Sequence, residues 1–370
     1  MYLVNFSNQY AAGPKNIALN FLKNACSSDH QFVFLLPDLQ EFRAVELTSN
    51  VKVVFVKKRF GVLGAMLNAL LVNKLYIPNM LKKNKVAAIL AFGNFLASET
   101  NTKKIVLLHH PYLVDEELFQ RLPIVQKLIE KLKRMLFKKT VANVDKVIVQ
   151  STYMEKKFLE KYPNDKGKTK IIPNPLSAKL TKSKAVLSEK ETQLNHKFRI
   201  LYVSRFYPHK NHSFLVRLSD ELNLKGFRHE IRVTVDHNLP GAQAFLSTIQ
   251  NRESIENIGE VEQSSLQAEY LSADLFIFPS KSETFGNPII EAMFYACPLM
   301  LPNLEYAIAL ADGAAEFYNP DDVLECCNKI MKIGNNSAVL DNMRERSKQQ
   351  GLAQIDADEW FDIYLQQLSE

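Results

Sequence analysis

The chain has 370 residues, a formal charge of +6 at neutral pH and a pI of about 8.9. Its 46% hydrophobic and 23% charged residues are typical of a soluble globular protein, and its length fits two or three domains. A mildly basic chain favours an anionic partner, and a nucleotide, a nucleic acid or an acidic membrane surface would each satisfy that preference.

Other classes of protein are excluded by what the sequence lacks. The N-terminus has no basic segment followed by an apolar core, so we expect no signal peptide. No apolar run reaches the roughly 18 residues of a membrane-spanning helix. The cysteines show no spacing typical of a disulfide framework or a metal site, which indicates reduced thiols in a cytosolic protein. They are Cys26, Cys297, Cys326 and Cys327.

Short β-branched runs alternate with longer helical patterns in the first half of the chain. We expect strands at 2–6, 31–36, 51–56, 86–92, 104–109 and 146–150, and helices at 13–25 and 114–139. Near-continuous apolar strands alternating with helices indicate a parallel sheet covered on both faces.

The alternation pauses in a polar stretch rich in lysine and serine and then restarts. We expect further strands at 198–206, 229–236, 273–280 and 297–303, and an amphipathic final helix. The pattern predicts an α/β domain at 1–175, a linker at 176–197, a second such domain at 198–352, and a C-terminal helix at 353–370 that packs back on the first domain. Ligands of open α/β sheets bind outside the carboxyl ends of the strands, so we expect a cleft between the two sets of strand ends.

Two cations follow the first strand of the second domain. Arg205 and Lys210 flank a short loop before a helix that we expect to begin near Asn211. Cations beside a helix N-terminus suit a phosphate group, because they supply charge and the free backbone N–H groups supply donors. The alternative is a pair of solvated surface charges.

Two acids flank the next strand-to-helix loop, in the stretch ETFGNPIIE. Asn287 is expected to cap this helix, and Gly286 would let a ligand approach the backbone. Glu283 precedes the helix, whereas Glu291 lies inside it among apolar residues. Glu291 is interpreted either as an acceptor of hydrogen bonds from ligand hydroxyls or as an acid facing water.

The first domain offers weaker signals. One strand ends in His109 and His110, and strand-end histidines are more often structural than catalytic. The loop after the first strand contains a single glycine, Gly13, far short of a dinucleotide-binding fingerprint. The acidic pair in DAD at 356–358 is explained by a helix start, where Asp is favoured, so we expect no metal site.

Taken in order, several segments resemble the retaining glycosyltransferases of family 4. ETFGNPIIE is similar to the E-x7-E motif of that family, ILYVSRFYPHKNHSFLV to its donor-diphosphate loop, and NIGEVEQSSLQAEYLSADLFIFPS to its nucleotide-base region. The matches cover roughly residues 140–300. The resemblance implies the GT-B architecture, two Rossmann-like doubly wound domains facing each other across a cleft, and transfer from a nucleotide-diphosphate sugar with retention.

The resemblance also implies roles for single residues. Arg205 and Lys210 would hold the diphosphate, Glu291 the ribose hydroxyls, and Glu283 the donor sugar at its reacting face. Backbone donors would come from Phe285, Gly286 and Asn287. His109, preferred over His110, would touch the sugar near the anomeric carbon, and Gly13 and His110 would line the cleft. Thr284 and Ala12 depart from glycines common in the family, which puts the seating of the sugar and the contact at Gly13 in doubt.

The expected partners are a nucleotide sugar and a saccharide acceptor, without nucleic acid, cofactor or metal, because cations can take the metal's role. Residues 124–139 combine an apolar stripe with many lysines, and basic flanks surround the apolar segment 60–72. Residues 124–139 are interpreted either as a core-facing helix with a solvated basic face or as a surface for anionic lipid. The second reading favours a lipid-linked acceptor in O-antigen, capsule or lipopolysaccharide synthesis, and a cytoplasmic protein peripheral on the inner face of the membrane.

Three other functions compete with that of a transferase acting on a lipid-linked acceptor. A glycoside hydrolase would need Glu283 and Glu291 as its acid pair, but eight helical residues span about 12 Å, beyond the usual carboxyl separations. A non-catalytic binder of two Rossmann-like lobes would release no nucleoside diphosphate. A transferase with a soluble acceptor would differ only in its acceptor.

Overall fold

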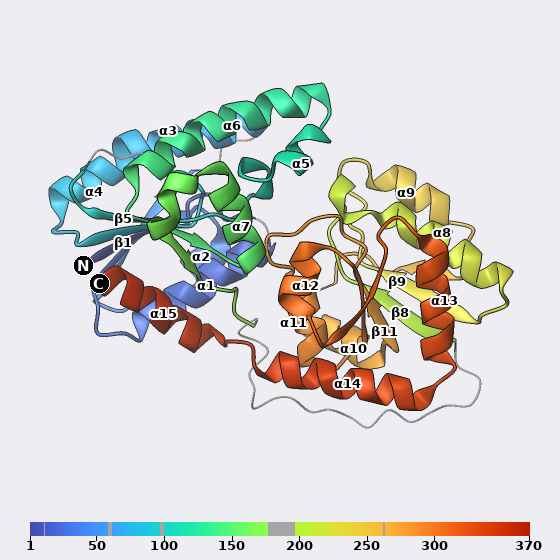
Figure 1. The fold of residues 1–370 in the computed structure, drawn as a ribbon. Helices are drawn as coiled ribbons and strands as arrows, with labels where there is room; N and C mark the ends of the chain where they lie inside the picture. The colour runs from blue at the N-terminus through green and yellow to red at the C-terminus, as the bar shows by residue number, and fades with distance from the viewer. Residues whose placement is uncertain (11, 58–60, 97–99, 177–196, 262) are drawn as a thin grey trace. The chain divides into compact units, whose positions relative to one another are not determined.

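The computed structural model describes residues 1–10, 12–57, 61–96, 100–176, 197–261 and 263–370 (Figure 1). The chain forms two compact units. Unit 1 is Met1–Ala178 together with Ile355–Glu370, and unit 2 is Lys179–Gln354. Most of the linker expected at 176–197 lies outside the described residues.

Unit 1 is built on a parallel sheet whose described strands run in the order β3-β2-β1-β4-β5-β6-β7. The order reverses between β1 and β4. The strands are β1 (Tyr2–Asn5), β2 (Phe32–Pro37), β3 (Val51–Val56), β4 (Ala88–Ala91), β5 (Lys103–Leu107), β6 (Lys146–Val149) and β7 (Thr169–Ile171). The helices are α1 (Ala12–Cys26), α2 (Gln40–Arg43), α3 (Gly61–Leu71), the π-helical η1 (Val72–Tyr76), α4 (Ile77–Lys83), the 3-10 turn η2 (Pro111–Leu113), α5 (Glu116–Gln120), α6 (Ile124–Asn143), α7 (Thr152–Lys161), the 3-10 turn η3 (Pro163–Lys168) and α15 (Ala357–Ser369).

Two hydrophobic clusters cover the two faces of this sheet. One joins α1 and α15, where the Phe21 ring lies 4.9 Å from that of Phe361 and 5.7 Å from that of Trp360. The other joins α4 and α6, with Ile77 and Phe137 buried against the opposite face. The aromatic side of α15 thus makes the end of the chain part of the unit 1 core.

Unit 2 repeats the topology with a parallel sheet in the order β10-β9-β8-β11-β12-β13. The reversal falls between β8 and β11. The strands are β8 (Phe198–Tyr202), β9 (His229–Val233), β10 (Ile255–Asn257), β11 (Leu275–Ile277), β12 (Leu299–Pro302) and β13 (Ala315–Tyr318). The helices are the 3-10 turn η5 (Pro208–Lys210), α8 (His212–Leu224), α9 (Ala242–Ile249), α10 (Gln263–Ser272), α11 (Asn287–Phe294), α12 (Glu305–Ala311), α13 (Val323–Gly334) and α14 (Ser337–Leu352).

The expected strands are all present, but three further strands were not expected from the sequence. They are β7, β10 and β13, short segments at sheet edges. Edge strands pair on one side only, and their mixed polar sequences TKI, IEN and AEFY lack the continuous apolar signal of central strands.

The single helix expected at 114–139 is wrong. Pro123 separates α5 from α6, because its ring fixes φ and removes a backbone donor. α5 is instead capped by Asp115, whose carboxylate accepts from the N–H of Leu118. Among the helices of the described ranges, none is long and apolar enough to cross a bilayer.

Candidate functional site

Three charged side chains of unit 2 lie on the loops where its strand order reverses. The loop after β8 carries Arg205 and Lys210, and the loop after β11 carries Glu283. Because β8 and β11 are parallel neighbours, both loops leave the same edge of the sheet. This is the position at which open α/β sheets bind ligands.

The two loops are fastened to each other through their backbones. The N–H of Lys281 donates to the carbonyl of His209 at 2.8 Å and joins the two loops. Within the first loop, the side-chain hydroxyl of Tyr202 on β8 donates to the carbonyl of Lys210 at 2.7 Å. Asn211 adopts a left-handed conformation, φ 55°, and ends the 3-10 turn just before α8. A fixed loop holds its side chains in place before any ligand arrives.

Lys210 and Glu283 form an ion pair between these loops. Lys210 Nζ lies 2.5 Å from Glu283 Oε1, and the side chains are only 14% and 11% exposed. Lys210 Nζ also lies 5.1 Å from the centre of the Phe278 ring. Lys210 and Glu283 lie 73 positions apart in the sequence, and the fold brings their charged groups into contact.

Arg205 lies on the same loop as Lys210, and part of its guanidinium has no hydrogen-bond partner within the described residues. Its Nε is buried and has no hydrogen-bond partner within the described residues. Its charge contributes to lowering the pKa of Asp236, although the backbone N–H of Asn238 is the main cause of that shift. A buried donor without a partner costs free energy, so an acceptor that meets it would be stabilised.

The start of α11 adds backbone donors to the site. Gly286, at φ 95°, is the N-cap, and the N–H of Ile289 donates to its carbonyl at 2.9 Å. The expected cap, Asn287, is therefore wrong by one position, since Asn287 is already helical. Within the described residues the N–H groups of Phe285 and Gly286 donate to no backbone carbonyl, which leaves them available at the helix start.

Glu291 is held by a tyrosine that the sequence did not single out. The hydroxyl of Tyr270, on α10, donates to Glu291 Oε2 at 3.0 Å. Burial raises the pKa of Glu291 to about 7, and the hydrogen bond from Tyr270 opposes that rise. Glu291 thus changes charge near neutral pH, which a helix-terminal acid facing water would not do.

In unit 1, His109 follows β5 and meets Asn94, which follows the neighbouring strand β4. Asn94 Nδ2 lies 3.3 Å from His109 Nε2, and the backbone N–H of His109 donates to Asn94 Oδ1 at 2.8 Å. Burial, with a smaller effect of His110, lowers the pKa of His109 to about 4. The imidazole of His109 is therefore neutral at physiological pH.

His110 takes a different direction from its neighbour. Its Nε2 lies 2.9 Å from Glu130 Oε2 on α6, and Lys133 Nζ lies 2.6 Å from Glu130 Oε1. This network ties the strand-end loop to α6. Gly13 lies in the first turn of α1, at the carboxyl end of β1.

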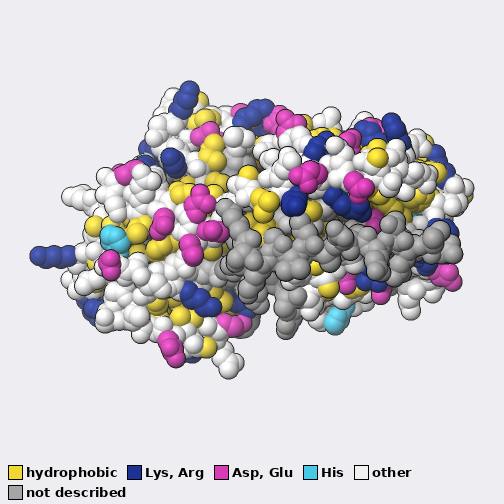
Figure 2. All heavy atoms as spheres, turned by 90° about the horizontal axis from the view of Figure 1, so that it is seen from below, with side chains coloured by type: hydrophobic (Ala, Val, Ile, Leu, Met, Phe, Trp, Pro, Cys, Tyr) yellow, Lys and Arg dark blue, Asp and Glu magenta, His cyan; other side chains and the backbone are white. Residues whose placement is uncertain are grey.

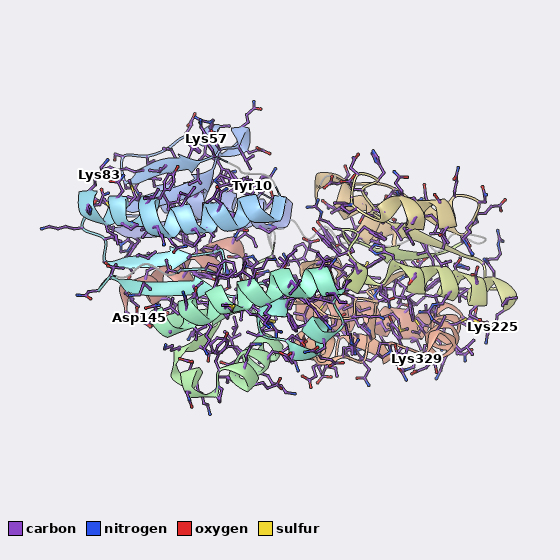
Figure 3. The ribbon with its side chains drawn as sticks, turned by 90° about the horizontal axis from the view of Figure 1, so that it is seen from above. Tyr10, Lys57, Lys83, Asp145, Lys225 and Lys329 are labelled. Atoms are coloured by element: carbon purple, nitrogen blue, oxygen red, sulfur yellow. The ribbon has the colours of Figure 1, made fainter. Side chains whose placement is uncertain are left out.

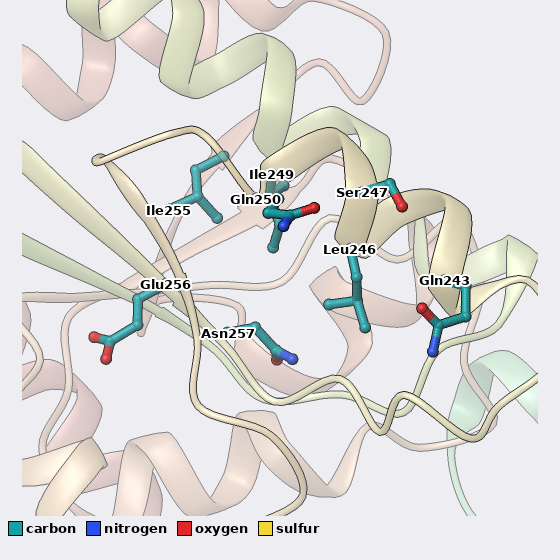
Figure 4. A pocket seen from close by; sticks show the side chains of 8 residues that line it. All are labelled: Gln243, Leu246, Ser247, Ile249, Gln250, Ile255, Glu256 and Asn257. Atoms are coloured by element: carbon teal, nitrogen blue, oxygen red, sulfur yellow. The ribbon is translucent and has the colours of Figure 1, made fainter.

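A pocket elsewhere in unit 2 does not coincide with these groups. It encloses about 390 Å³ between α9 and the edge strand β10 (Figure 4). Gln243, Ser247 and Glu256 contribute polar lining, but Lys210, Glu283 and Glu291 do not line it. Strand β9 separates it from the switch point in the sheet order.

No metal cluster is formed by the residues that the structure describes. Across those ranges, no three His, Cys, Asp or Glu side chains are grouped so as to hold an ion. The acidic pair near the C-terminus has a structural role, because Asp356 caps α15 by accepting from the N–H groups of Asp358 and Glu359.

Sequence reasoning missed Tyr270 and Asn94. Tyr270 lies in the middle of α10 and reaches Glu291 across 21 positions, so no local motif marks it. Asn94 carried a weak signal, because it follows a glycine directly after a strand and Asn is favoured at positive φ. Its φ is 62°.

Two family models match this chain. Residues 197–336 match the model described as Glycosyl transferases group 1, and residues 12–179 match the model described as Glycosyltransferase Family 4. The O-antigen chain mannosyltransferase RfbU of Salmonella typhimurium is 26% identical over 193 residues. That match covers 51% of this chain and 51% of RfbU, so the aligned part spans about half the length of this relative.

Several solved structures cover the chain from end to end, and two of them are a sucrose-phosphate synthase and WaaG. The sucrose-phosphate synthase of Thermosynechococcus elongatus superposes with a TM-score of 0.80 at 16% identity, covering 100% of this chain and 99% of its own. WaaG, described as a glycosyltransferase involved in lipopolysaccharide biosynthesis, superposes with a TM-score of 0.73 at 12% identity and covers 100% of both chains. These likenesses confirm the expected GT-B architecture, two Rossmann-like units with parallel sheets.

Proposed function

This chain belongs to the glycosyltransferases that combine a family 4 domain with a group 1 domain, and we propose that it is a retaining enzyme of bacterial surface-polysaccharide assembly. It moves a sugar from a nucleoside-diphosphate sugar to a saccharide acceptor. The observation that carries this proposal is the pair of cations on the loop after β8, at the switch point of the unit 2 sheet: Lys210, whose side chain is 14% exposed, and Arg205, whose Nε is buried. Two cations and free N–H groups at a helix start fit a diphosphate.

The transfer breaks the bond between the anomeric carbon and the diphosphate oxygen and forms a bond from that carbon to the acceptor hydroxyl. The hydroxyl attacks the face from which the diphosphate leaves, and its proton passes to the departing phosphate oxygen. Lys210 and Arg205 stabilise the negative charge that grows on the diphosphate. They supply in this way the charge that a metal ion supplies elsewhere, so the proposed reaction is independent of metal.

The remaining donor contacts follow from the same loops. Glu291 accepts hydrogen bonds from the ribose hydroxyls, and it does so as a carboxylate above its pKa of about 7. Glu283 faces the donor sugar while it orients Lys210 through their ion pair. The N–H groups of Phe285, Gly286 and Asn287 offer donors to the phosphate or the sugar.

His109 of unit 1 contacts the donor sugar near the anomeric carbon in this proposal. Its ring is neutral at physiological pH, because burial lowers its pKa to about 4. A neutral imidazole donates a hydrogen bond to a sugar hydroxyl without adding a positive charge. In this proposal the positive charge at the donor comes from Arg205 and Lys210, which contact the diphosphate.

The acceptor is inferred to be lipid-linked from an exposed apolar stripe on α6. Ile124, Val125 and Leu128 are 79%, 70% and 64% exposed, and Leu132 and Met135 are also exposed. The core-facing alternative for this stripe is therefore wrong: α6 turns Glu130, Phe137, Thr140 and Val141 inward instead. An amphipathic helix with its apolar side outward suits a lipid surface.

Basic side chains frame this stripe. Lys127, Lys131, Lys138 and Lys139 of α6 make no ion pair within the described residues, whereas Lys133 and Arg134 are paired with acids. Residues 58–60 of the second basic and apolar stretch lie outside the described residues. Beyond them, Leu67, Leu70 and Leu75 are exposed on α3 and η1, and Lys83 lies at the end of α4 (Figure 3).

α4 and α6 pack on the same face of the unit 1 sheet, so their lysines border one surface. On the side of the molecule seen in Figure 2, by contrast, basic and acidic side chains are intermixed. Anionic lipid attracts a cluster of lysines at about 1 kcal/mol for each one near the surface. We infer a cytoplasmic enzyme that docks on the inner face of the membrane, where a lipid-linked saccharide would be presented.

RfbU supports the choice of pathway, because its name describes transfer of mannose to an O-antigen chain. The likeness to a sucrose-phosphate synthase shows the fold alone and does not favour a soluble acceptor. A soluble acceptor remains the second candidate, and the exposed stripe of α6 is the observation that disfavours it.

The test is a screen of nucleotide-diphosphate sugars with the full chain, in the presence and absence of lipid-linked and soluble saccharides. We expect one donor to release nucleoside diphosphate in excess chelator, faster with the lipid-linked acceptor, and to give a product with the donor's anomeric configuration. A protein that binds donors, seen as a rise in Tm, but releases no nucleoside diphosphate with any acceptor would be a binder. Inverted product would contradict retention, and activity restored only by a divalent metal would contradict metal independence.

A further inference from the structure

We propose that Asn94 is a positioning residue that holds His109 as the tautomer with its proton on Nδ1. The inference rests on the proposed function in one respect only: the proposed function supplies the donor sugar to which this proton would be donated. Asn94 and His109 lie at the same level of the sheet. β4 and β5 pair in parallel with Ala91 opposite Val106, and each of the two residues follows three positions later.

The hydrogen bonds around Asn94 fix which side-chain atom is which. A backbone N–H can only donate, so the Asn94 atom 2.8 Å from the His109 nitrogen is the carbonyl oxygen Oδ1. The other atom, 3.3 Å from His109 Nε2, is therefore the amide nitrogen Nδ2. An amide nitrogen only donates, so Nε2 must accept and carry no proton. In a neutral imidazole the proton then resides on Nδ1.

The backbone conformation of Asn94 indicates that the fold itself sets this arrangement. Its φ of 62° is left-handed, a conformation that non-glycine residues adopt at a cost. Asn94 is also 7% exposed, so its amide is not free to reorient toward water.

Because Nε2 of His109 is hydrogen-bonded to Asn94, Nδ1 is the ring nitrogen that can contact a ligand. No described residue hydrogen-bonds Nδ1, and the ring is partly exposed, so Nδ1–H can donate to a ligand. His109 then acts as a hydrogen-bond donor to a sugar oxygen. It cannot take a proton through Nε2 without breaking its bond to Asn94. Asn94 thus determines which ring nitrogen of His109 is left for a ligand, and that this nitrogen donates a hydrogen bond.

His229 provides an internal reference within the same chain. Its Nδ1 lies 2.8 Å from the carbonyl of Phe227, an atom that can only accept, so His229 also carries its proton on Nδ1. Its Nε2 accepts from the hydroxyl of Ser219 at 2.9 Å. The ring nitrogens of the two histidines should therefore show the same pattern.

The experiment is ¹⁵N NMR of the histidine ring nitrogens in the full chain, assigned with His109→Gln. We expect His109 to show a protonated Nδ1 and a bare Nε2, as His229 does. In Asn94→Asp a carboxylate can only accept, so the proton of His109 moves to Nε2 while His229 is unchanged. Asn94→Gly, which fits a positive φ, keeps the backbone and yields a mixture of tautomers.

A bare Nδ1 in the wild-type protein would overturn the proposal, and so would an unchanged His109 pattern in both folded variants. The NMR readout needs no donor, so it stands even if the transferase assay fails. Where transfer is measured, Asn94→Asp should lower kcat by up to about 10²-fold, as expected for a misplaced contact, with a smaller change in donor KM. An unaltered kcat together with the shifted tautomer would separate His109 from the reaction.

Discussion

The two units share one topology but differ in the chemistry at their strand ends. In unit 2 the switch point carries a buried ion pair, Lys210 with Glu283, and a buried guanidinium donor of Arg205. In unit 1 the ends of β4 and β5, next to the switch point between β1 and β4, carry Asn94 and His109, which are neutral hydrogen-bonding groups. The same fold therefore presents charge on one sheet and directional neutral contacts on the other.

This difference separates two kinds of recognition. Charge acts over several ångströms and suits a diphosphate whose charge grows during a reaction. Neutral donors and acceptors act only at contact, and they suit hydroxyl groups whose charge does not change. A transferase must hold a charged leaving group and position a sugar, so it needs charged groups for the first task and neutral hydrogen-bonding groups for the second.

The largest expected effect is the loss of the unit 2 cation. Lys210→Ala should lower kcat by about 10²–10³-fold, roughly 3–4 kcal/mol in the barrier, because the lost charge stabilised the transition state more than the bound donor. Lys281→Ala, in the neighbouring loop after β11 and with an exposed side chain, is the matched control and should retain wild-type kcat. Equal kcat values for Lys210→Ala and wild type at saturating donor would remove Lys210 from the mechanism.

A second, smaller effect should come from Glu291. Ribose hydroxyls do not change charge, so Glu291→Gln should raise donor KM by about tenfold at pH 8 with little change in kcat, the worth of one charge-assisted hydrogen bond. Below the pKa of about 7 the wild-type acid is protonated and accepts more weakly. Donor KM should therefore fall as pH rises from 6 to 8 in the wild type, but not in the variant.

The same pKa has a consequence for folding. The folded pKa lies above the usual value of 4.5, so the native state keeps a proton that the unfolded chain loses between about pH 4.5 and 7. The contribution of Glu291 to stability therefore falls as pH rises through that window, and Glu291→Gln should remove this component from urea-unfolding data. For donor binding, by contrast, a wild-type donor KM that does not change with pH would show that Glu291 has only a structural role.

Glycines in the two strand-end regions should respond differently to alanine. A Cβ on Gly286 would lie 3.1 Å from Ile289 Cδ1 at a φ of 95°, so Gly286→Ala should lower the free energy of unfolding by about 1–2 kcal/mol. On Gly93 a Cβ would meet Asn8 Nδ2 at an ordinary 3.5 Å, so Gly93→Ala should cost less. Chemical denaturation measures both, and a larger loss for Gly93→Ala would contradict the comparison.

A further prediction concerns the outer surface of unit 1. Lys131→Glu with Lys138→Glu should weaken flotation with anionic liposomes, by roughly 1 kcal/mol or more for each lysine, and the wild-type binding should weaken with salt. The matched control in unit 2, Lys225→Glu with Lys332→Glu, changes the net charge equally and should leave flotation intact. Flotation that is absent at low salt, or lost equally in both double variants, would refute docking through α6.

The sequence alone determined the alternation of strands and helices, because buried parallel strands require continuous apolar runs and their helices an amphipathic period. It also determined the loops that carry Arg205, Lys210, Glu283 and Glu291, since strand ends and helix starts leave a local signal. It did not reveal the short edge strands β7, β10 and β13, which bury too little to require such runs.

Only the tertiary structure decided which groups meet. The ion pair of Lys210 with Glu283, the bond from Tyr270 to Glu291 and the clamp of Asn94 on His109 each join residues between 15 and 73 positions apart. Such pairs depend on strand order and register, which no local pattern encodes. The same holds for α6: its period predicted an apolar side, but only packing against the sheet decided that this side faces outward, because the inward positions were filled by Phe137 and Val141.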